Sequence, residues 1–183
     1  FGGSQAGVPV GRLAAVTATS FFPAKPLGCY GDGGALLTDD AEVAALLRSI
    51  RVHGQGTDKY DNVRIGINGR LDTVQAAVLL AKLEVFDDEL AARHVVAQRY
   101  GAALADVVEV PSVPAGSVSA WAQYTVRHPR RDELVARLAD RGIPTAVYYS
   151  RPLHRQPGYQ GFPTSAATLE RADRLAATVV SLP

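Results

Sequence analysis

The segment that most restricts the fold of this chain is residues 23–34, which have the sequence PAKPLGCYGDGG. It contains two prolines and four glycines, so it cannot continue a helix or a strand and must form turns. The preceding residues 13–22 (LAAVTATSFF) are apolar, with small and β-branched side chains, and predict a buried strand. The chain therefore passes from a strand into tight turns, and Lys25 lies within them.

The rest of the chain alternates between strand and helix patterns. A strand is predicted at residues 34–38, and a helix begins after Asp39 or Asp40 and ends near Gly54. Residues 54–69 form an irregular connection, and from Asp72 to Leu104 the apolar spacing indicates one long helix or two in series. Further strands are predicted at residues 107–111, 121–128, 144–149 and 179–182, and further helices at 132–141 and 164–177. This alternation predicts an α/β unit, here a small open sheet with helices on one side.

Composition excludes several classes of function. The 183 residues carry a net charge of +1, with no basic cluster to attract nucleic acid or an anionic membrane. No apolar run reaches the roughly 18 residues that span a bilayer, and no secretory signal is present at the start, so a cytoplasmic protein is predicted. The single cysteine, Cys29, suggests neither a disulfide nor a metal site and is interpreted as a packed residue near a turn.

Ser20 and Lys25 are the pair of residues whose types and spacing suggest a chemical function. A lysine forms a Schiff base with a phosphorylated aldehyde only when part of its population is neutral, and burial in a loop beside a cofactor would lower its pKa in that direction. The serine hydroxyl and the N–H groups of tight turns could bind the phosphate. The simpler interpretation is a solvated lysine between two prolines, and spacing alone favours it.

Three segments together resemble one protein family. They are SFFPAKPLGCYGDGGALLTDD (residues 20–40), GINGRLDTVQAAVLLAKL (66–83) and GIPTAVYYSRPLHRQPGY (142–159). In this order and at these intervals they are similar to the lysine segment, a Gly-x-Asn-x-Arg-x-Asp-x-x-Gln-Ala-Ala helix start and the C-terminal substrate segment of the DegT/DnrJ/EryC1/StrS aminotransferases. The resemblance implies the fold type I of pyridoxal-phosphate-dependent transferases, which is aspartate aminotransferase-like. Residues 1–86 would then be part of the large domain and residues 87–183 a small C-terminal α/β domain.

The resemblance also implies roles for the cofactor residues. Lys25 would hold pyridoxal 5'-phosphate through its aldehyde and act as general base and acid, and Ser20 would bind the cofactor phosphate. Asn68 would reach the phosphate in the partner subunit, which implies a homodimer with a shared active site.

Four further residues would bind the substrate. Arg70 would bind an anionic substrate group, with a salt bridge to Asp72 or to the helix ahead as an equally weighted alternative. Tyr148, Tyr149 and His154 would contact the substrate rather than serve as packing aromatics and a surface histidine. Several relatives have histidine where this chain has Tyr148. Trp121 is interpreted as a core residue, and residues 53–60 as a solvated flap without a catalytic role.

The implied reaction is transfer of an amino group, from glutamate by family analogy, to a nucleotide-linked keto-sugar. Residues 21–34 are especially similar to enzymes that aminate UDP-2-acetamido-3-keto-glucuronic acid for surface polysaccharide synthesis. The alternatives are a dTDP-keto-deoxysugar aminotransferase and a non-catalytic regulatory or binding module that keeps the fold. A sugar 3-dehydratase would have histidine at the lysine position, so Lys25 argues against it.

Complete family members have, before the matched region, an aspartate that pairs with the pyridinium nitrogen, an aromatic residue that stacks on the ring and a glycine-rich turn. None of these features is found here, and the chain ends shortly before the family's final helix. We therefore expect the isolated 183-residue chain to be inactive and poorly folded, and its full-length parent to be an aminotransferase.

Overall fold

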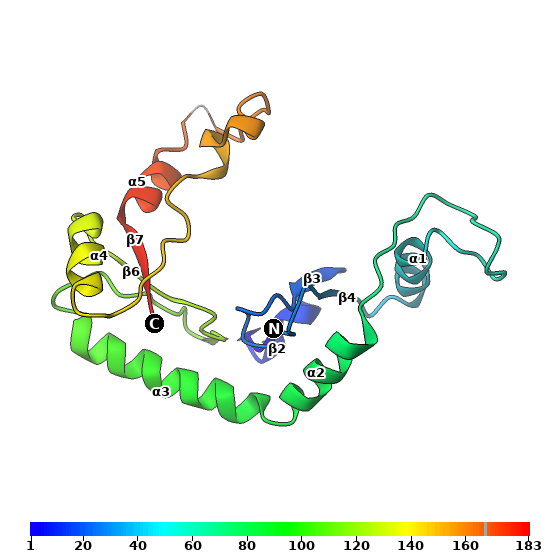
Figure 1. Cartoon of the computed structure of the whole chain (residues 1–183), viewed down its shortest axis with the longest axis horizontal. Helices are drawn as coiled ribbons and strands as arrows, with labels where there is room; N and C mark the ends of the chain where they lie inside the picture. Colours follow the sequence, from blue (N-terminus) through cyan, green and yellow to red (C-terminus); the bar gives the residue numbers. More distant parts are fainter. Residues whose placement is uncertain (167) are drawn as a thin grey trace. The chain divides into compact units, whose positions relative to one another are not determined.

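The computed structural model describes residues 1–166 and 168–183 and divides into two compact units (Figure 1). Unit 1 comprises Phe1–His94 and Val113–Ala122, and unit 2 comprises Val95–Ser112 and Gln123–Pro183. Within the described residues, none of the helices combines the length and apolar character needed to cross a membrane. The assignment of residues 1–86 and 87–183 to a large and a small domain stays a prediction.

Unit 1 contains two small antiparallel sheets. Strands β2 (Val8–Pro9), β1 (Ser4–Gln5) and β5 (Ser117–Val118) lie in that order in one sheet, and a 3-10 helix, η1 (Val10–Arg12), follows β2. Strand β3 (Thr17–Ser20) pairs with β4 (Gly34–Leu37) in the other, with Ser20 opposite Gly34. The turn-rich segment is therefore a closed loop whose two ends meet. The predicted strand over residues 13–22 is shorter than expected, because residues 13–16 are bends.

The helices of unit 1 begin where the sequence predicts. Helix α1 (Ala41–Arg51) has Asp40 as its N-cap, whose carboxylate accepts hydrogen bonds from the backbone N–H groups of Glu42 and Val43. The irregular connection after it is anchored by a bridge between Val52 and Asn68. Helices α2 (Thr73–Leu83) and α3 (Phe86–Leu104) follow in series, as one of the two predicted alternatives states, and residues 95–104 of α3 belong to unit 2.

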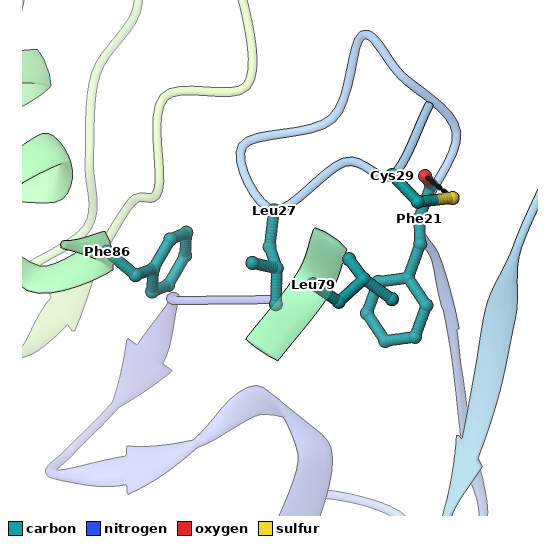
Figure 2. Packing of buried hydrophobic residues seen from close by; sticks show 5 residues of the cluster. All are labelled: Phe21, Leu27, Cys29, Leu79 and Phe86. Atoms are coloured by element: carbon teal, nitrogen blue, oxygen red, sulfur yellow. Dashed lines mark hydrogen bonds between the residues drawn. The ribbon is translucent and has the colours of Figure 1, made fainter. Parts of the chain in front are cut away.

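The core of unit 1 surrounds the closed loop. Phe21, Leu27, Cys29, Leu79 and Phe86 form one buried cluster (Figure 2), and Figure 2 draws Leu79 of α2 beside Leu27 and Phe21. Cys29 is fully buried, and its thiol donates to the carbonyl oxygens of Phe21 and Gly31, both at 3.0 Å. The interpretation of Cys29 as a packed residue near a turn is confirmed.

The face of α2 that packs against the loop differs from the one suggested by its valine and alanine spacing. Val74, which begins that apolar series, is 72% exposed, whereas Leu79 is 6% exposed. The sequence TVQAAVLLAKL is apolar on nearly every side, so periodicity alone does not identify the buried face.

Unit 2 is built on a two-stranded sheet. Strand β6 (Tyr124–Arg127) pairs antiparallel with β7 (Val179–Leu182), and the opposed pair Val126 and Val180 is almost completely buried. Helices α4 (Arg131–Ala139) and α5 (Glu170–Thr178) complete the unit, with two 3-10 turns, η2 (Leu153–Arg155) and η3 (Pro157–Tyr159). The buried guanidinium of Arg131 donates to the carbonyls of Ala176 and Val179, which links α4 to the end of α5.

Several predicted elements of unit 2 are wrong. Residues 107–111 and 144–149 are not strands, and only Glu109 and Ala146 form isolated bridges, to Arg127 and Ser181. The small open sheet is therefore reduced to the β6 and β7 pair. The helix predicted over residues 164–177 begins at Glu170, and one position of that prediction, residue 167, lies outside the described residues.

Trp121, in unit 1, is half-buried rather than a core residue. Its indole N–H donates to Nδ1 of His94 at 3.1 Å. This bond pairs the polar end of the side chain. Part of the ring remains in contact with solvent.

We predict that the isolated chain unfolds in a broad, weakly cooperative transition. Its sheets have two or three short strands, which are marginal alone, and large apolar side chains are exposed, with Ile65 at 97%. Circular dichroism and calorimetry on heating would test this, together with binding of a dye that reports exposed apolar surface. A sharp transition with an enthalpy on the order of 0.7 kcal/mol per residue would contradict the prediction.

Candidate functional site

Ser20 and Lys25 lie in the closed loop between β3 and β4. Ser20 is the last residue of β3, and its hydroxyl oxygen accepts a hydrogen bond from the N–H of Phe22 at 3.2 Å. The Lys25 N–H donates to the Phe22 carbonyl at 2.8 Å, which forms a tight turn. Lys25 is exposed in this chain, so the burial expected for a Schiff-base lysine is not present here, while its backbone N–H is held in the turn by the bond to Phe22.

The loop folds back closely on itself at Gly28. A Cβ atom at this position would lie 2.7 Å from the carbonyl oxygen of Pro23 and 2.8 Å from that of Phe22. Such contacts are with backbone atoms that cannot move aside, so only glycine fits here. The outgoing part of the loop, residues 22–25, is therefore pressed against the returning part, residues 27–31.

Two side chains of α2 also hold this loop. The Tyr30 N–H donates to Oε1 of Gln75 at 2.8 Å, and Nζ of Lys82 donates to the Gly28 carbonyl at 2.6 Å. Reasoning from the sequence did not identify either residue as part of the site. The available signal was that Gln75 belongs to the helix-start motif and that Gln75, Leu79 and Lys82 are spaced to share one helix face.

Asn68 and Arg70 lie next to each other at the end of the irregular connection. Oδ1 of Asn68 accepts a hydrogen bond from Nε of Arg70 at 3.1 Å, and both side chains are exposed. Within residues 1–166 and 168–183, Arg70 has this bond and no ion pair with Asp72, so the predicted salt-bridge alternative is not present. The Asn68 amide nitrogen and the outer nitrogens of Arg70 remain hydrogen-bond donors for an anion.

The other three predicted site residues belong to unit 2. The rings of Tyr148 and Tyr149 meet edge to face, with centroids 5.5 Å apart, and both are exposed. The side chain of His154 is 16% exposed, and its Nε2 lies 3.1 Å from Oδ1 of Asp173 in α5. Whether these residues contact a substrate stays a prediction.

Asp173 joins two residues of the η2 turn to α5. Besides His154, it binds Arg155 through two hydrogen bonds, from Nε at 3.1 Å and from Nη2 at 2.8 Å. The hydrogen bonding and charge of Arg155 hold the pKa of Asp173 below its usual range, with a smaller effect from His154. The sequence did not single out Asp173, because it is one acidic residue on an ordinary amphipathic helix.

The residues of the loop suit a phosphorylated aldehyde. The hydroxyl of Ser20 accepts one hydrogen bond and keeps its own hydrogen to donate to a phosphate oxygen. Lys25 is exposed, so its amine is accessible to a carbonyl carbon. Lys25 and Ser20 are therefore the residues of this loop that could hold pyridoxal phosphate.

We expect Asp173→Asn to loosen the η2 turn at neutral pH. Because the folded-state pKa is depressed, the carboxylate stabilises the fold above the unfolded pKa of about 3.9. That stabilisation is lost as the pH falls through the lower, folded-state value. An NMR titration of the Asp173 carboxyl carbon in the unsubstituted chain measures the pKa, and a midpoint at or above about 3.9 would refute the depression. Amide hydrogen exchange at residues 153–155 measures the loosening in Asp173→Asn, with Asp140→Asn as a control that leaves the turn unaltered.

The chain matches the DegT/DnrJ/EryC1/StrS aminotransferase family over residues 1–183. The UDP-2-acetamido-2-deoxy-3-oxo-D-glucuronate aminotransferase of Pseudomonas aeruginosa is 46% identical over 184 residues, which are 100% of this chain and 50% of the relative. A dTDP-3-amino-3,4,6-trideoxy-alpha-D-glucose transaminase of Micromonospora megalomicea subsp. nigra is 40% identical over 188 residues, with the same coverage of 100% and 50%.

A crystal structure from Brucella abortus, of a DegT DnrJ EryC1 StrS aminotransferase, matches with a TM-score of 0.97 and 53% identity. The match covers 100% of this chain and 49% of that one. The chain thus spans about half the length of the curated relatives it matches. These likenesses confirm the predicted α/β aminotransferase fold, and the chain belongs to the DegT/DnrJ/EryC1/StrS aminotransferase family.

Proposed function

We propose that the whole protein is a pyridoxal-phosphate-dependent aminotransferase that transfers an amino group to a keto group on a nucleotide-linked sugar. The observation that carries the proposal is the exposed amine of Lys25 on a rigid loop that begins at the Ser20 hydroxyl. A family of aminotransferases and two relatives named for amination of nucleotide sugars support the same conclusion.

In this proposal Lys25 and Ser20 have different roles at the cofactor. Pyridoxal phosphate, when bound, supplies an aldehyde that accepts the amino group and a ring that takes up electrons. Lys25 would hold the cofactor through its amine, and the same amine would act as the general base and acid that moves the substrate's proton. Ser20 donates its hydroxyl hydrogen to the cofactor phosphate, which keeps the aldehyde within reach of Lys25.

Asn68 and Arg70 act at the same site from a second copy of the chain. The bond from Arg70 Nε to Asn68 Oδ1 leaves the other side-chain donors of these two exposed residues available to an anion. We infer that the Asn68 amide binds the phosphate of the partner subunit and that Arg70 binds an anionic group of the substrate. The proposed active form is therefore a homodimer, and the proposed location is the cytoplasm.

The substrate we favour is a UDP-linked 3-keto-glucuronate, with glutamate as the amino donor and surface polysaccharide as the product's destination. The relative named for this sugar is 46% identical, against 40% for the relative named for a dTDP-linked trideoxy sugar, which makes the dTDP class the second candidate. Tyr148, Tyr149 and His154 would contact the sugar, because aromatic rings with polar ends suit a sugar's alternating C–H and O–H groups.

Borohydride reduction of the whole protein with pyridoxal phosphate should attach the cofactor to Lys25. Residues 1–183 contain three lysines, Lys25, Lys59 and Lys82, and peptide mapping distinguishes them. Lys25→Ala should abolish the attachment, while Lys59→Ala, a change in the irregular connection, should leave it intact. Attachment to any other lysine would refute the assignment of Lys25.

Arg70→Gln should weaken turnover of a uronate substrate more than turnover of a neutral deoxysugar. Loss of a charge-assisted hydrogen bond costs roughly 1.5–3 kcal/mol, or about tenfold to a hundredfold in kcat/KM. Formation of 2-oxoglutarate from glutamate, measured with each keto-sugar, gives the two ratios. An equal loss with both sugars would show that Arg70 does not bind the sugar carboxylate.

A further inference from the structure

One face of α2 is in contact with the returning part of the closed loop, residues 27–31. Gln75, Leu79 and Lys82 are four and then three residues apart, so they project from the same side of the helix. Leu79 is 6% exposed and packs in the same cluster as Leu27, which is 2% exposed (Figure 2). An apolar contact therefore lies between two polar ones along this face.

The contact of Gln75 is with the backbone of the loop. Its Oε1 accepts the Tyr30 N–H at 2.8 Å, and its Nε2 lies 3.1 Å from where a Cβ of Gly31 would be. The amide side chain therefore lies against the loop at both of these residues. A side chain without an acceptor at position 75 would leave the Tyr30 N–H to water.

The contact of Lys82 is also with the backbone, but through a carbonyl. Its ammonium donates to the Gly28 oxygen at 2.6 Å, a short, charge-assisted bond, and lies 5.0 Å from the centre of the Tyr30 ring. The two α2 side chains thus bind one donor and one acceptor of the same short segment, two residues apart.

We propose that Gln75 and Lys82 are positioning residues that set where the Lys25 amine lies. They fix the returning part of the loop, and the outgoing part is tied to it because Cys29 N–H bonds to the Phe21 carbonyl and Gly28 packs on Pro23. Neither side chain needs to touch cofactor or substrate. The inference rests on the proposed function only for the identity of Lys25 as the cofactor lysine.

The test uses the whole protein with Gln75→Leu and Lys82→Met, which remove the acceptor and the donor while keeping apolar bulk. Gln75→Glu keeps an acceptor for the Tyr30 N–H. Lys59→Met is the matched control, because Lys59 lies over the Tyr60 ring and, among the described residues, has no hydrogen bond to the closed loop. Two quantities are measured: amide hydrogen exchange at residues 29–31 without cofactor, and the rate at which borohydride traps pyridoxal phosphate on Lys25.

Gln75→Leu and Lys82→Met should each speed exchange at residues 29–31 by about fivefold, as expected for one lost hydrogen bond, and slow trapping at Lys25. Gln75→Glu and Lys59→Met should match the unsubstituted protein in both the exchange rate and the trapping rate. If Gln75 only filled space, Gln75→Glu would not differ from Gln75→Leu in this way. Unchanged exchange and trapping in Gln75→Leu and Lys82→Met would overturn the inference. Trapping of pyridoxal phosphate at another lysine of the unsubstituted protein would instead overturn the proposed function. The exchange measurement does not depend on Lys25, so it still tests the contacts of Gln75 and Lys82 in that case.

Discussion

The antiparallel pairing of β3 with β4 is the constraint on which the candidate site depends. It places Ser20 opposite Gly34 and so brings together the two ends of the segment between them. A free loop of this length would sample many conformations, and closing its ends removes much of that freedom. The Cys29 N–H bond to the Phe21 carbonyl and the burial of Leu27 then remove most of the rest. The result is a rigid support on which an exposed lysine can be presented.

The parts of this arrangement that follow from local chemistry could be predicted from the sequence. Prolines and glycines predict the loop, and the pair Asp39 and Asp40 predicts the start of α1, because an aspartate carboxylate caps backbone N–H groups within three residues of itself, as Asp40 does here. Strands are harder to predict, since residues 144–149 have a strand-like composition but pair only through Ala146. Whether a suitable segment becomes a strand depends on a neighbour far along the chain.

The contacts of Gln75 and Lys82 with the loop could not be predicted from the sequence, because they too depend on residues far along the chain. Gln75 bonds to a residue 45 positions earlier and Lys82 to one 54 positions earlier, and no local pattern specifies either contact. Helix α2 made the choice of face harder, because Val74 looks as suitable for burial as Leu79. Resemblance identified Ser20, Lys25, Asn68 and Arg70 as candidates, but it assigned no role to the helix that supports them.

The lysines of the chain show why position matters more than residue type. Lys82 donates to a carbonyl and faces an aromatic ring, so its amine would have to give up both contacts before attacking a carbonyl carbon. Lys59 lies over Tyr60 in the irregular connection, away from the closed loop in sequence. Lys25 is exposed, and its backbone N–H is held by a hydrogen bond to the Phe22 carbonyl. In our proposal, Lys82 therefore stabilises the geometry of the loop, and Lys25 carries the amine that reacts.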